Sequence, residues 1–546
     1  MRRLRDPHLL LFFALLALYV LPLWSFRYFP SQDGPAHLEN ALMLKEYDAP
    51  DSARYRDFYT INPHPDPNWF GHVLLVALMY FLPPLVAEKV LLTGYVVLLP
   101  LSLRFALRSL RPGAEWLAVL AFPFVGNGFL HLGFYNFCYS LPMYFVVVGY
   151  WLRHRDGLSW KTGAVLALLA LVLYFCHIVS LAAACLAVGL LGVWLSLGEW
   201  AAWRRKGRIG PNPLRRAVWA RGVGPALAFL PAAALAVLFL RRQGTATATN
   251  VLPIDRLEML FELKALVSYL GIETLVGLGL AVALLFAMGY AGVAWLRRGR
   301  PDDSGGLLLL AAAYVVVFFA APQGMSGGLF IPQRLSLFPY FALILWLGTQ
   351  PLGRFLRGGL VAVALLTALL FLGLHVASYA VFNDYLDEYL TAAPRIESQA
   401  TVLPLSFSHT GRDAEGRPLS DRVAPFRHAA GLLAVQRRAV DLANYEGKVG
   451  YFPLIYRPEV NPFDLVSLDN SNPDRGLEGI PPRVDFLSYP QRSGQPIDYV
   501  LLWNLRDDLR DRPETRSIFA QLHEGYDKTY ESPRGLVQLY RRKDLR

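Results

Sequence analysis

The stretch HLLLFFALLALYVLPLWSF, residues 8–26, is apolar and long enough to cross a lipid bilayer. A membrane-spanning helix needs about 20 consecutive apolar residues. The stretch follows MRRLR, so a secretory signal peptide is one interpretation. No small-residue cleavage site follows it, and the aromatic residues of PLWSFRYFP are typical of a helix that remains anchored at a membrane surface. We therefore expect a retained first transmembrane helix.

The composition extends this expectation to most of the chain. Of the 546 residues, 54% are hydrophobic and 17% are charged, whereas soluble proteins have about 25% charged residues. Further apolar segments lie at 69–84, 86–107, 115–130, 134–152, 161–178, 179–197, 222–240, 274–296, 305–322, 333–350 and 358–380. The sequence therefore predicts a polytopic α-helical membrane protein with about 11–13 transmembrane helices.

The net charge of +11 does not indicate nucleic-acid binding, because many arginines lie in short loops between apolar segments, where they act as orientation signals. Cys138, Cys176 and Cys185 all lie within apolar segments. Their positions show neither a disulfide framework nor the spacing of a metal–thiolate site.

The basic clusters predict which loops face outward. Placing them in the cytoplasm leaves loops 29–68 and 241–273 and the C-terminal part outside. Residues 69–107 should then cross an odd number of times, although their length fits two passes separated at Pro83-Pro84. Either one piece is re-entrant or one basic cluster breaks the rule.

The composition changes near residue 380. Short apolar runs such as ATVLPLSF (400–407) and DYVLLW (498–503) suit buried strands, and residues 428–443 read as an amphipathic helix. We predict two domains: a transmembrane domain at 1–380 and a C-terminal soluble α/β domain at 381–546.

The segment SQDGPAHLENA places acids just after the first span. Asp33 precedes Gly-Pro, which fixes a turn, and the following residues suit a short helix lying along the membrane interface, with Ala36, Asn40, Met43 and Leu44 on one side. In a plain loop such acids are only solvated. A carboxylate held at a membrane-embedded mouth has the chemistry of a general base or of a ligand for a hard divalent cation.

The chain resembles the GT-C glycosyltransferase superfamily, and in particular its bacterial members related to protein mannosyltransferases and lipid A aminoarabinose transferases. The resemblance rests on the overall order of elements and on QDGPAHL (32–38), DPNWFGHVLLVAL (66–78) and IPQRLSLFPYFAL (331–343). The usual motif of such enzymes has two adjacent acids or Asp-x-Asp. Here Gly follows Asp33 and the next acid is Glu39, so a divalent cation is compatible with the sequence but is not required by it.

The resemblance implies an enzyme that transfers a sugar from a polyprenyl-phosphate donor to an unknown envelope acceptor, with Asp33 as the catalytic base. It also implies a multi-pass protein of the cell inner membrane whose C-terminal domain is extracytoplasmic. The expected partners are the lipid-linked donor, membrane lipids and the acceptor, with no nucleic acid. The sequence contains no phosphate-cradling Gly-rich loop, in agreement with a lipid-linked rather than a nucleotide-linked donor.

The departing lipid phosphate needs a cation. Arg334, at the outer end of an apolar segment, is the first candidate; the alternative is an anchor that snorkels to the interface. Lys264 on the amphipathic segment 254–272 is the second candidate, unless it merely lies on the solvated face of that helix.

Residues for recognition of the sugar or the acceptor are expected near Asp33 and in the hairpin tip at 127–136. They are His37, Glu39, Asn127, His131 and Asn136. Amides bond sugar hydroxyls while neighbouring aromatic rings stack on sugar faces. For the hairpin tip the alternative is helix capping with interfacial aromatics.

No metal ligands are assigned from the sequence. His64 and Asp66 form a weak candidate pair, but the surrounding prolines favour an ordinary loop. His72 and His177 lie in apolar segments, where a lone histidine is more often structural than a ligand.

Two other functions share these features. A transporter or flippase of a lipid-linked solute would also have many helices, but it would place charges deep in several spans. A non-catalytic envelope scaffold would fit the loss of the acid pair.

Overall fold

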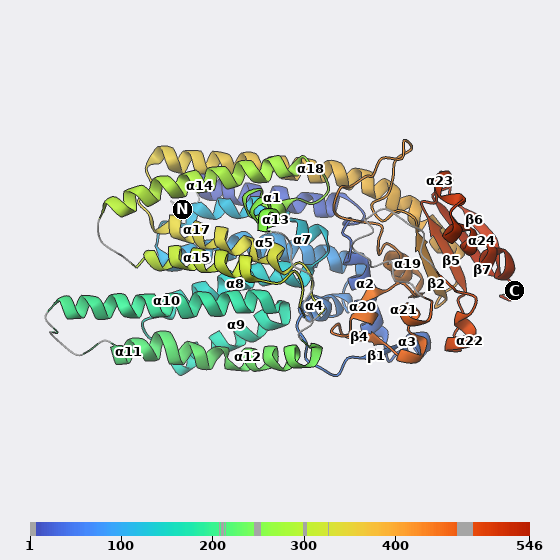
Figure 1. Ribbon diagram of the computed structural model, residues 1–546, viewed down its shortest axis with the longest axis horizontal. Coiled ribbons are helices and arrows are strands. Elements are labelled where there is room, and N and C mark those ends of the chain that lie inside the picture. The colour runs from blue at the N-terminus through green and yellow to red at the C-terminus, as the bar shows by residue number, and fades with distance from the viewer. Residues whose placement is uncertain are drawn as a thin grey trace.

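The first apolar stretch forms helix α1 (Pro7–Ser25) in the computed structural model, which describes residues 7–206, 208, 212, 214–244, 253–298, 303–325, 327–466 and 484–545. Within these ranges, six helices are long and apolar enough to cross a membrane. They are α1, α5 (Pro84–Leu110), α10 (Ile178–Arg205), α12 (Gly224–Gln243) with the turns before it, α14 (Glu273–Arg297) and α18 (Arg354–Tyr389). Figure 1 shows these helices running along the long axis of the molecule.

The outward faces of the long helices are apolar. Large side chains there are more than half exposed, among them Val193, Leu230, Phe286 and Leu366. Soluble proteins rarely expose apolar surface over so wide an area. Inward-facing residues of α1, such as Tyr19, pack into the bundle, and the Tyr19 hydroxyl donates to the carbonyl of Ala368 at 2.8 Å. The long helices thus form a packed bundle whose surface suits lipid.

Shorter helices complete the bundle. They are α4 (Phe70–Met79), α8 (Tyr135–His154), α9 (Trp160–Cys176), α15 (Gly305–Ala320) and α17 (Leu337–Thr349). The expected break at Pro83-Pro84 is present, because α4 ends before it and α5 begins at Pro84. Helix α4 has 10 residues, or about 15 Å, which is half the thickness of a bilayer core. Residues 69–107 therefore contain a single long helix.

Two predicted segments are not single helices. Residues 115–130 form η3 (Glu115–Ala121), α6 (Phe122–Val125) and α7 (Gly128–His131), with a break at Gly126 and a new helix start at Asn127. The amphipathic segment 254–272 forms only α13 (Pro253–Phe261) and η5 (Lys264–Leu266), because Leu263 has the left-handed φ of 48°. In both places backbone turns interrupt an apolar pattern that reads as continuous in the sequence.

The C-terminal part contains a five-stranded mixed sheet in the order β3-β2-β5-β7-β6. Its strands are β2 (Thr401–Ser406), β3 (Val440–Asp441), β5 (Tyr499–Trp503), β6 (Tyr526–Glu531) and β7 (Val537–Arg542). Strand β2 is parallel to β3 and β5, and β7 is antiparallel to β5 and β6. The apolar runs predicted as strands are thus β2 and β5, and every residue of β5 is buried, as expected of a central strand.

The predicted helix 428–443 is shorter than expected. Helix α19 (Ala430–Arg437) ends where Arg438 adopts a left-handed φ of 53°, and the chain then enters β3. Helix α24 (Pro513–Gly525) has 13 residues, and α18 runs past the predicted boundary at residue 380 to Tyr389. The smaller elements are α20 (Tyr445–Val449), β4 (Leu454–Tyr456), η6 (Leu390–Arg395), η7 (Pro458–Val460), α21 (Pro462–Leu465), α22 (Tyr489–Ser493) and α23 (Asp507–Arg510).

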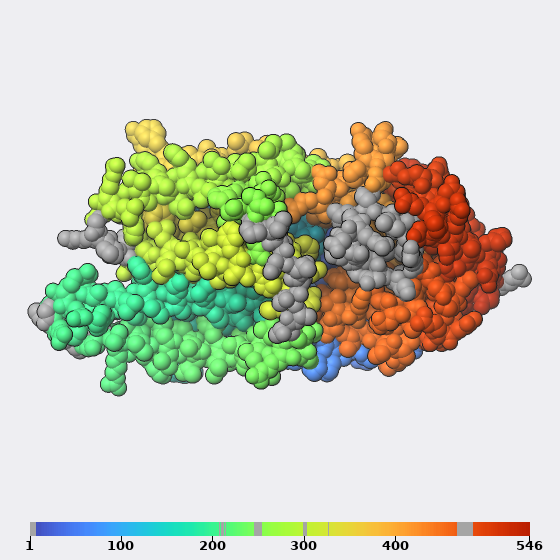
Figure 2. Space-filling view, in the orientation of Figure 1, coloured from blue at the N-terminus to red at the C-terminus, as the bar shows by residue number. Residues whose placement is uncertain are grey.

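The first loop packs together with the C-terminal part. It forms α2 (Gly34–Glu46), η2 (Pro50–Ser52), α3 (Ala53–Phe58) and β1 (Tyr59–Ile61), and β1 pairs with β4 in an antiparallel ladder. Figure 2 shows the C-terminal residues covering one end of the helix bundle, with residues of the first loop visible at their edge. The remaining short elements of the bundle are α11 (Leu214–Val218), η4 (Trp219–Val223) and α16 (Ile331–Leu335).

Helix α2 is not the interfacial helix that the sequence predicts. Every residue from Gly34 to Met43 is buried, because α4 and α5 pack on α2 from the bundle and α19 packs on it from the C-terminal part. The approach of α19 is close: a Cβ on Gly431 would lie 2.5 Å from the carbonyl oxygen of Pro35. The acids of the first loop therefore lie inside the protein.

Candidate functional site

The turn that carries Asp33 is fixed by the loop between α7 and α8. The Asp33 N–H donates to the carbonyl of Leu132 at 3.2 Å. Gly133 has a φ of +82°, and a Cβ there would lie 2.6 Å from the Gly34 nitrogen and 2.7 Å from that of Asp33. Only glycine fits this position, because the atoms in the way belong to the backbone.

We expect the Gly133→Ala variant to be less stable than wild type by about 1–3 kcal/mol, since the turn must move to admit the methyl group. Gly113→Ala is the matched control: Gly113 has a φ of +91°, but no atom lies within 4 Å of the position that an added methyl carbon would take. Thermal unfolding of both variants in detergent separates the clash from the backbone strain that they share. Equal shifts in the two midpoints would contradict the close packing of the Asp33 turn.

The Asp33 carboxylate is buried, with 4% of the residue exposed, and is held by polar side chains. Gln32 Nε2 donates to Oδ1 at 3.1 Å, and the Tyr445 hydroxyl donates to Oδ2 at 3.1 Å. His428 Nε2 lies 3.7 Å from Oδ1. Burial raises the pKa of Asp33 above its usual range, against the opposing effect of the nearby His37. A carboxylate with a raised pKa is a stronger base, and this one is oriented by two hydrogen bonds.

Arg334 on α16 is also buried, with 9% exposed. Its guanidinium carbon lies 4.8 Å from the ring centroid of Phe134 and 5.5 Å from that of Phe137. It donates to the carbonyl of Leu329, whereas its Nε has no hydrogen-bond partner among the described residues. Among the described residues, no carboxylate forms a salt bridge with Arg334.

The structure brings Arg334 and Asp33 into one neighbourhood. The side chains of Asp33, Tyr445 and Tyr451 lie within electrostatic range of the Arg334 guanidinium, although no ion pair joins Asp33 and Arg334 among the described residues. The tyrosines come from the C-terminal part, Asp33 from the first loop and Arg334 from the turn before α17. An acidic and a basic side chain far apart in sequence thus lie in the same region, where the C-terminal part covers the bundle.

His37 lies one helical turn after Asp33, and its ring Nε2 is 2.8 Å from the carbonyl oxygen of Gly133. Its Nδ1 faces the Glu446 carboxylate, which also lies 2.8 Å from His72 Nε2. His37 is therefore part of a buried His–Glu–His cluster. His37 is thus buried, whereas a residue that contacts a sugar directly would be exposed to the site.

Glu39 points to a different part of the protein. Its Oε1 accepts from the backbone N–H of Asp441, and it is 2% exposed. Burial, together with repulsion from the Asp441 carboxylate, raises the pKa of Glu39 well above its usual range, and burial raises the pKa of Asp441 to about 7. The two carboxyl groups form a buried pair between α2 and β3.

The polar residues of the hairpin tip are engaged within the protein. The Asn127 side chain accepts from the N–H groups of Phe129 and Leu130 and so caps α7. His131 is bonded on both ring nitrogens, to Ser268 Oγ at 2.7 Å and to the Tyr379 hydroxyl at 2.6 Å. Asn127 thus caps a helix, as the alternative interpretation of the hairpin tip expects. Both side chains have structural partners within the protein.

Asn136 and Lys264 have different surroundings. Asn136 Oδ1 accepts from the N–H of Gly71 at 2.6 Å and thereby fixes the start of α4, the helix that carries His72. Lys264 Nζ lies 2.8 Å from Glu258 and 3.3 Å from Glu262, in ion pairs within its own segment. The Lys264 contacts match the solvated-face alternative.

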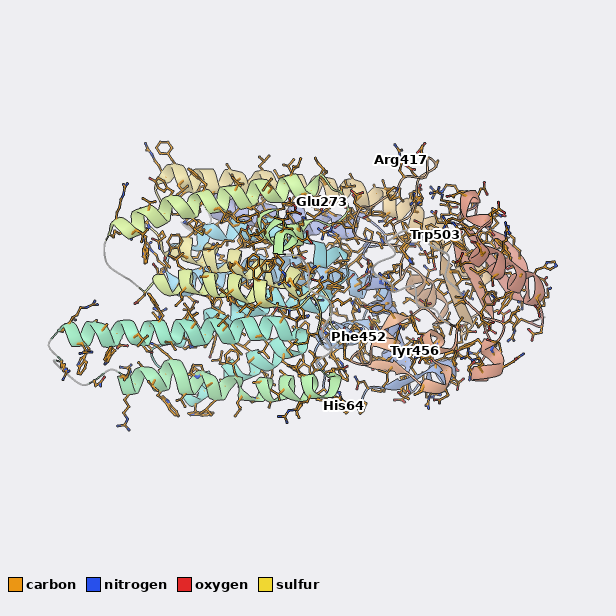
Figure 3. All side chains as sticks on the ribbon, in the orientation of Figure 1. His64, Glu273, Arg417, Phe452, Tyr456 and Trp503 are labelled. Atoms are coloured by element: carbon orange, nitrogen blue, oxygen red, sulfur yellow. The ribbon has the colours of Figure 1, made fainter. Side chains whose placement is uncertain are left out.

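The weak pair His64 and Asp66 does not form a metal site. Asp66 is buried in a salt bridge with Arg242 and also accepts from Asn62 Nδ2 at 3.1 Å. His64 is exposed and lies at the edge of the molecule in Figure 3.

Sequence reasoning missed the contribution of the C-terminal part. Tyr445, Glu446 and His428 reach the Asp33 turn only because α19 and α20 fold back onto α2. Glu446 lies 374 residues from His72, and no local spacing links the two. The only sequence signal was the position of His72 within an apolar helix.

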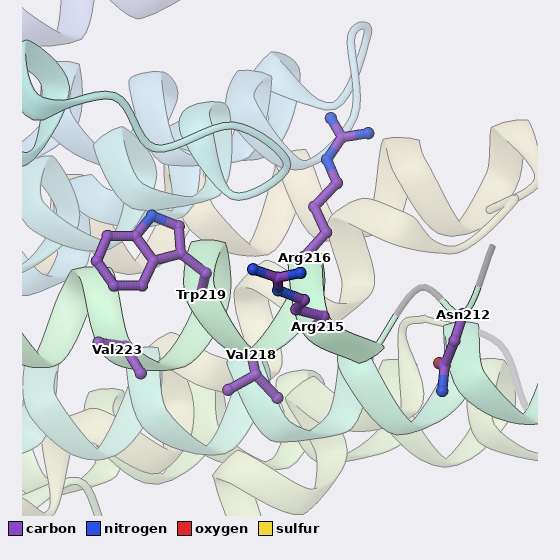
Figure 4. A pocket seen from close by; sticks show the side chains of 6 residues that line it. All are labelled: Asn212, Arg215, Arg216, Val218, Trp219 and Val223. Carbon is purple, nitrogen blue, oxygen red and sulfur yellow. The ribbon is translucent and has the colours of Figure 1, made fainter.

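A separate hollow lies at the other end of the bundle, near the basic segment before α12. It has a volume of about 510 Å³ and is shown in Figure 4. Its lining residues are Asn212, Arg215, Arg216, Val218, Trp219 and Val223. It is remote from Asp33, since this segment belongs to the opposite end of the molecule in Figure 1.

Comparison with known proteins adds no assignment to this geometry. No protein-family model matches the sequence, and a search of curated proteins found no significant relative.

Proposed function

We propose that the chain is a membrane glycosyltransferase that moves a sugar from a polyprenyl-phosphate donor to an acceptor outside the cytoplasm. We further propose that it is a multi-pass protein of an inner membrane with about 11 membrane passes, counting the interrupted segment 115–131 and the shorter helices other than α4. The C-terminal α/β part would then lie on the outer side. The reaction class comes from the resemblance to GT-C enzymes. The arrangement of side chains around Asp33 supports the proposal.

The observation that carries the proposal is the presence of Asp33 and Arg334 in one buried region of the protein. A buried guanidinium without a carboxylate partner is unfavourable unless an anion joins it. The lipid phosphate is such an anion, and phosphate is a preferred ligand of the planar guanidinium fork. The nearby Asp33 carboxylate is held in place by Gln32 and Tyr445. Together they fit the two ends of a displacement at an anomeric carbon.

In the proposed step the acceptor hydroxyl oxygen attacks the anomeric carbon while Asp33 takes the hydroxyl proton. The bond between that carbon and the phosphate oxygen breaks, and its electron pair leaves with the polyprenyl phosphate. Arg334 stabilises the charge that develops on this leaving group. The displacement is direct, so the configuration at the anomeric carbon inverts.

The helix arrangement supports the outward orientation. Helix α1 leads toward the Asp33 turn, and α5 leads away from it to the arginines at 104–111, while the short α4 adds no full crossing. Arg111 donates to the carbonyl of Thr349, which places that cluster near the basic start of α18. Arginine-rich ends gathered at one end of the bundle are typical of the cytoplasmic side.

Incubating the purified chain with polyprenyl-phosphate sugars that carry a labelled sugar tests the proposal. We expect release of unlabelled polyprenyl phosphate and transfer of the label to an acceptor from an envelope extract. Movement of the intact labelled lipid across a vesicle membrane without its cleavage would instead support a flippase. The absence of both cleavage and movement of the lipid would support a scaffold.

A further inference from the structure

Three side chains from distant segments converge beside the Asp33 turn. They are His37 on α2, His72 on α4 and Glu446 on α20, and one ligand atom of each lies within 4.8 Å of the others. The two imidazole rings are perpendicular, with centroids 4.9 Å apart, so they converge on the carboxylate rather than stack. Phe452, labelled in Figure 3, packs against both rings from the C-terminal part.

The hydrogen bonding of His37 leaves one nitrogen directed at the carboxylate. Its Nε2 lies 2.8 Å from the carbonyl oxygen of Gly133, which accepts only, so this nitrogen carries a proton. In the neutral ring Nδ1 then presents a lone pair to Glu446. His37 Nδ1 and Glu446 Oε1 are both buried and in close contact with each other, and neither atom has another hydrogen-bond partner in the described part of the chain. Two facing lone pairs repel unless a proton or a metal cation lies between them.

The donor set and its surroundings match a metal centre. His37 is 4% exposed, His72 1% and Glu446 0%, so the carboxylate is removed from water. Two imidazoles and one carboxylate are the protein ligands of many zinc sites that keep a fourth position open. The backbone carbonyl on His37 orients the ring as outer partners of metal-bound histidines do, and the aromatic side chains limit solvent access.

We propose that His37, His72 and Glu446 bind one divalent first-row transition-metal ion, with zinc as the best fit. Imidazole ligands favour such ions over Mg²⁺ and Ca²⁺, which prefer sets made only of oxygen atoms. Ligand atoms on a single zinc lie about 3–3.5 Å apart, so small side-chain shifts complete the site. This site does not include the second acid of the usual GT-C loop motif. It does not depend on the proposed transfer reaction.

The ion would join the first loop and α4 to the C-terminal part. His37 and His72 belong to elements at the end of the bundle, and Glu446 belongs to the segment that covers them. Metal binding of this kind contributes to the stability of the docked arrangement. It also places a fixed positive charge one helical turn from Asp33.

Metal counting on the tag-free, detergent-purified chain tests the proposal. After removal of metal with a chelator and equilibration with Zn²⁺, we expect about one zinc ion per chain, not displaced by excess Mg²⁺. The His72→Gln and Glu446→Gln variants should bind zinc at least about tenfold more weakly. The His64→Gln and Glu459→Gln variants, which change exposed residues of the same types, should bind as wild type does.

Two results would overturn the site. One is a wild-type chain that retains no zinc, in which case a protonated His37 paired with Glu446 explains the cluster. The other is equal zinc binding by the cluster variants and the exposed-residue controls. If the cluster variants do not fold, Co²⁺ loading of wild type decides: intense visible absorption of a four-coordinate ion supports the site, and the weak spectrum of aqueous Co²⁺ overturns it.

Discussion

We expect the Asp33→Asn variant to lose glycosyl transfer by about 10²–10⁴-fold, the usual contribution of a general base. Asparagine keeps the size and shape of the side chain but does not take a proton from the acceptor hydroxyl. The substitution should leave the fold intact, because the Asp33 side chain does not cap α2 and its partners Gln32 and Tyr445 still have an amide to bond. Initial rates with saturating lipid donor, measured at equal amounts of folded protein, give the effect on kcat.

The matched control is Asp51→Asn, which removes the charge of an exposed aspartate in the same loop and should leave the rate unchanged. An unchanged elution profile and unfolding temperature for Asp33→Asn establish that the loss is chemical. Transfer at a near-wild-type rate would remove Asp33 from the mechanism, because another group would then be taking the proton.

The sequence predicts the elements whose pattern is local. The apolar segment 8–26 becomes α1, and the short apolar runs at 400–407 and 498–503 become the neighbouring strands β2 and β5. The Pro83-Pro84 break also appears where expected. In each case the deciding information is a continuous run of apolar residues or a proline, and such information acts over a few residues.

What the sequence does not predict is the burial of the first loop. Helix α2 reads as a helix with one apolar side, yet both of its sides are covered, one by α4 and the other by α19. The second cover comes from a segment nearly 400 residues away in the chain, as the close approach of Gly431 to the carbonyl oxygen of Pro35 shows. Periodicity reports which face of a helix is apolar, but it does not report which distant segment covers the polar face.

This burial changes how the acidic side chains near the first loop must be interpreted. Solvated acids after a membrane helix need no explanation, whereas buried ones must be paired, protonated or used. Glu39 accepts a hydrogen bond from the backbone N–H of Asp441, and the Glu446 carboxylate contacts the imidazoles of His37 and His72. Asp33 instead is held by an amide and a phenol hydroxyl. The candidate site is therefore defined by long-range packing, and Asp33 was predictable only because it follows the first long apolar segment and precedes Gly-Pro.

The Arg334→Gln variant should reduce kcat/KM for the lipid donor by about 10²–10³-fold, because it removes the charge that stabilises the leaving phosphate. Arg334→Lys should have a milder effect with a different kinetic form. Lysine keeps the charge but loses the planar fork and much of the stacking on Phe134, so the KM for the donor should rise more than kcat falls. Measuring initial rates over a range of donor concentrations separates the two parameters.

The control for Arg334 is Arg354, whose guanidinium carbon lies 4.9 Å from the ring of Phe355 in a comparable cation–π contact at the exposed start of α18. Arg354→Gln and Arg354→Lys should leave the donor dependence unchanged, since that residue lies at the opposite end of the bundle from Asp33. If Arg334 served only as an anchor at the membrane interface, its variants would lower the unfolding temperature without changing the KM for the donor. A raised KM together with an unchanged unfolding temperature in Arg334→Lys therefore distinguishes phosphate recognition from anchoring.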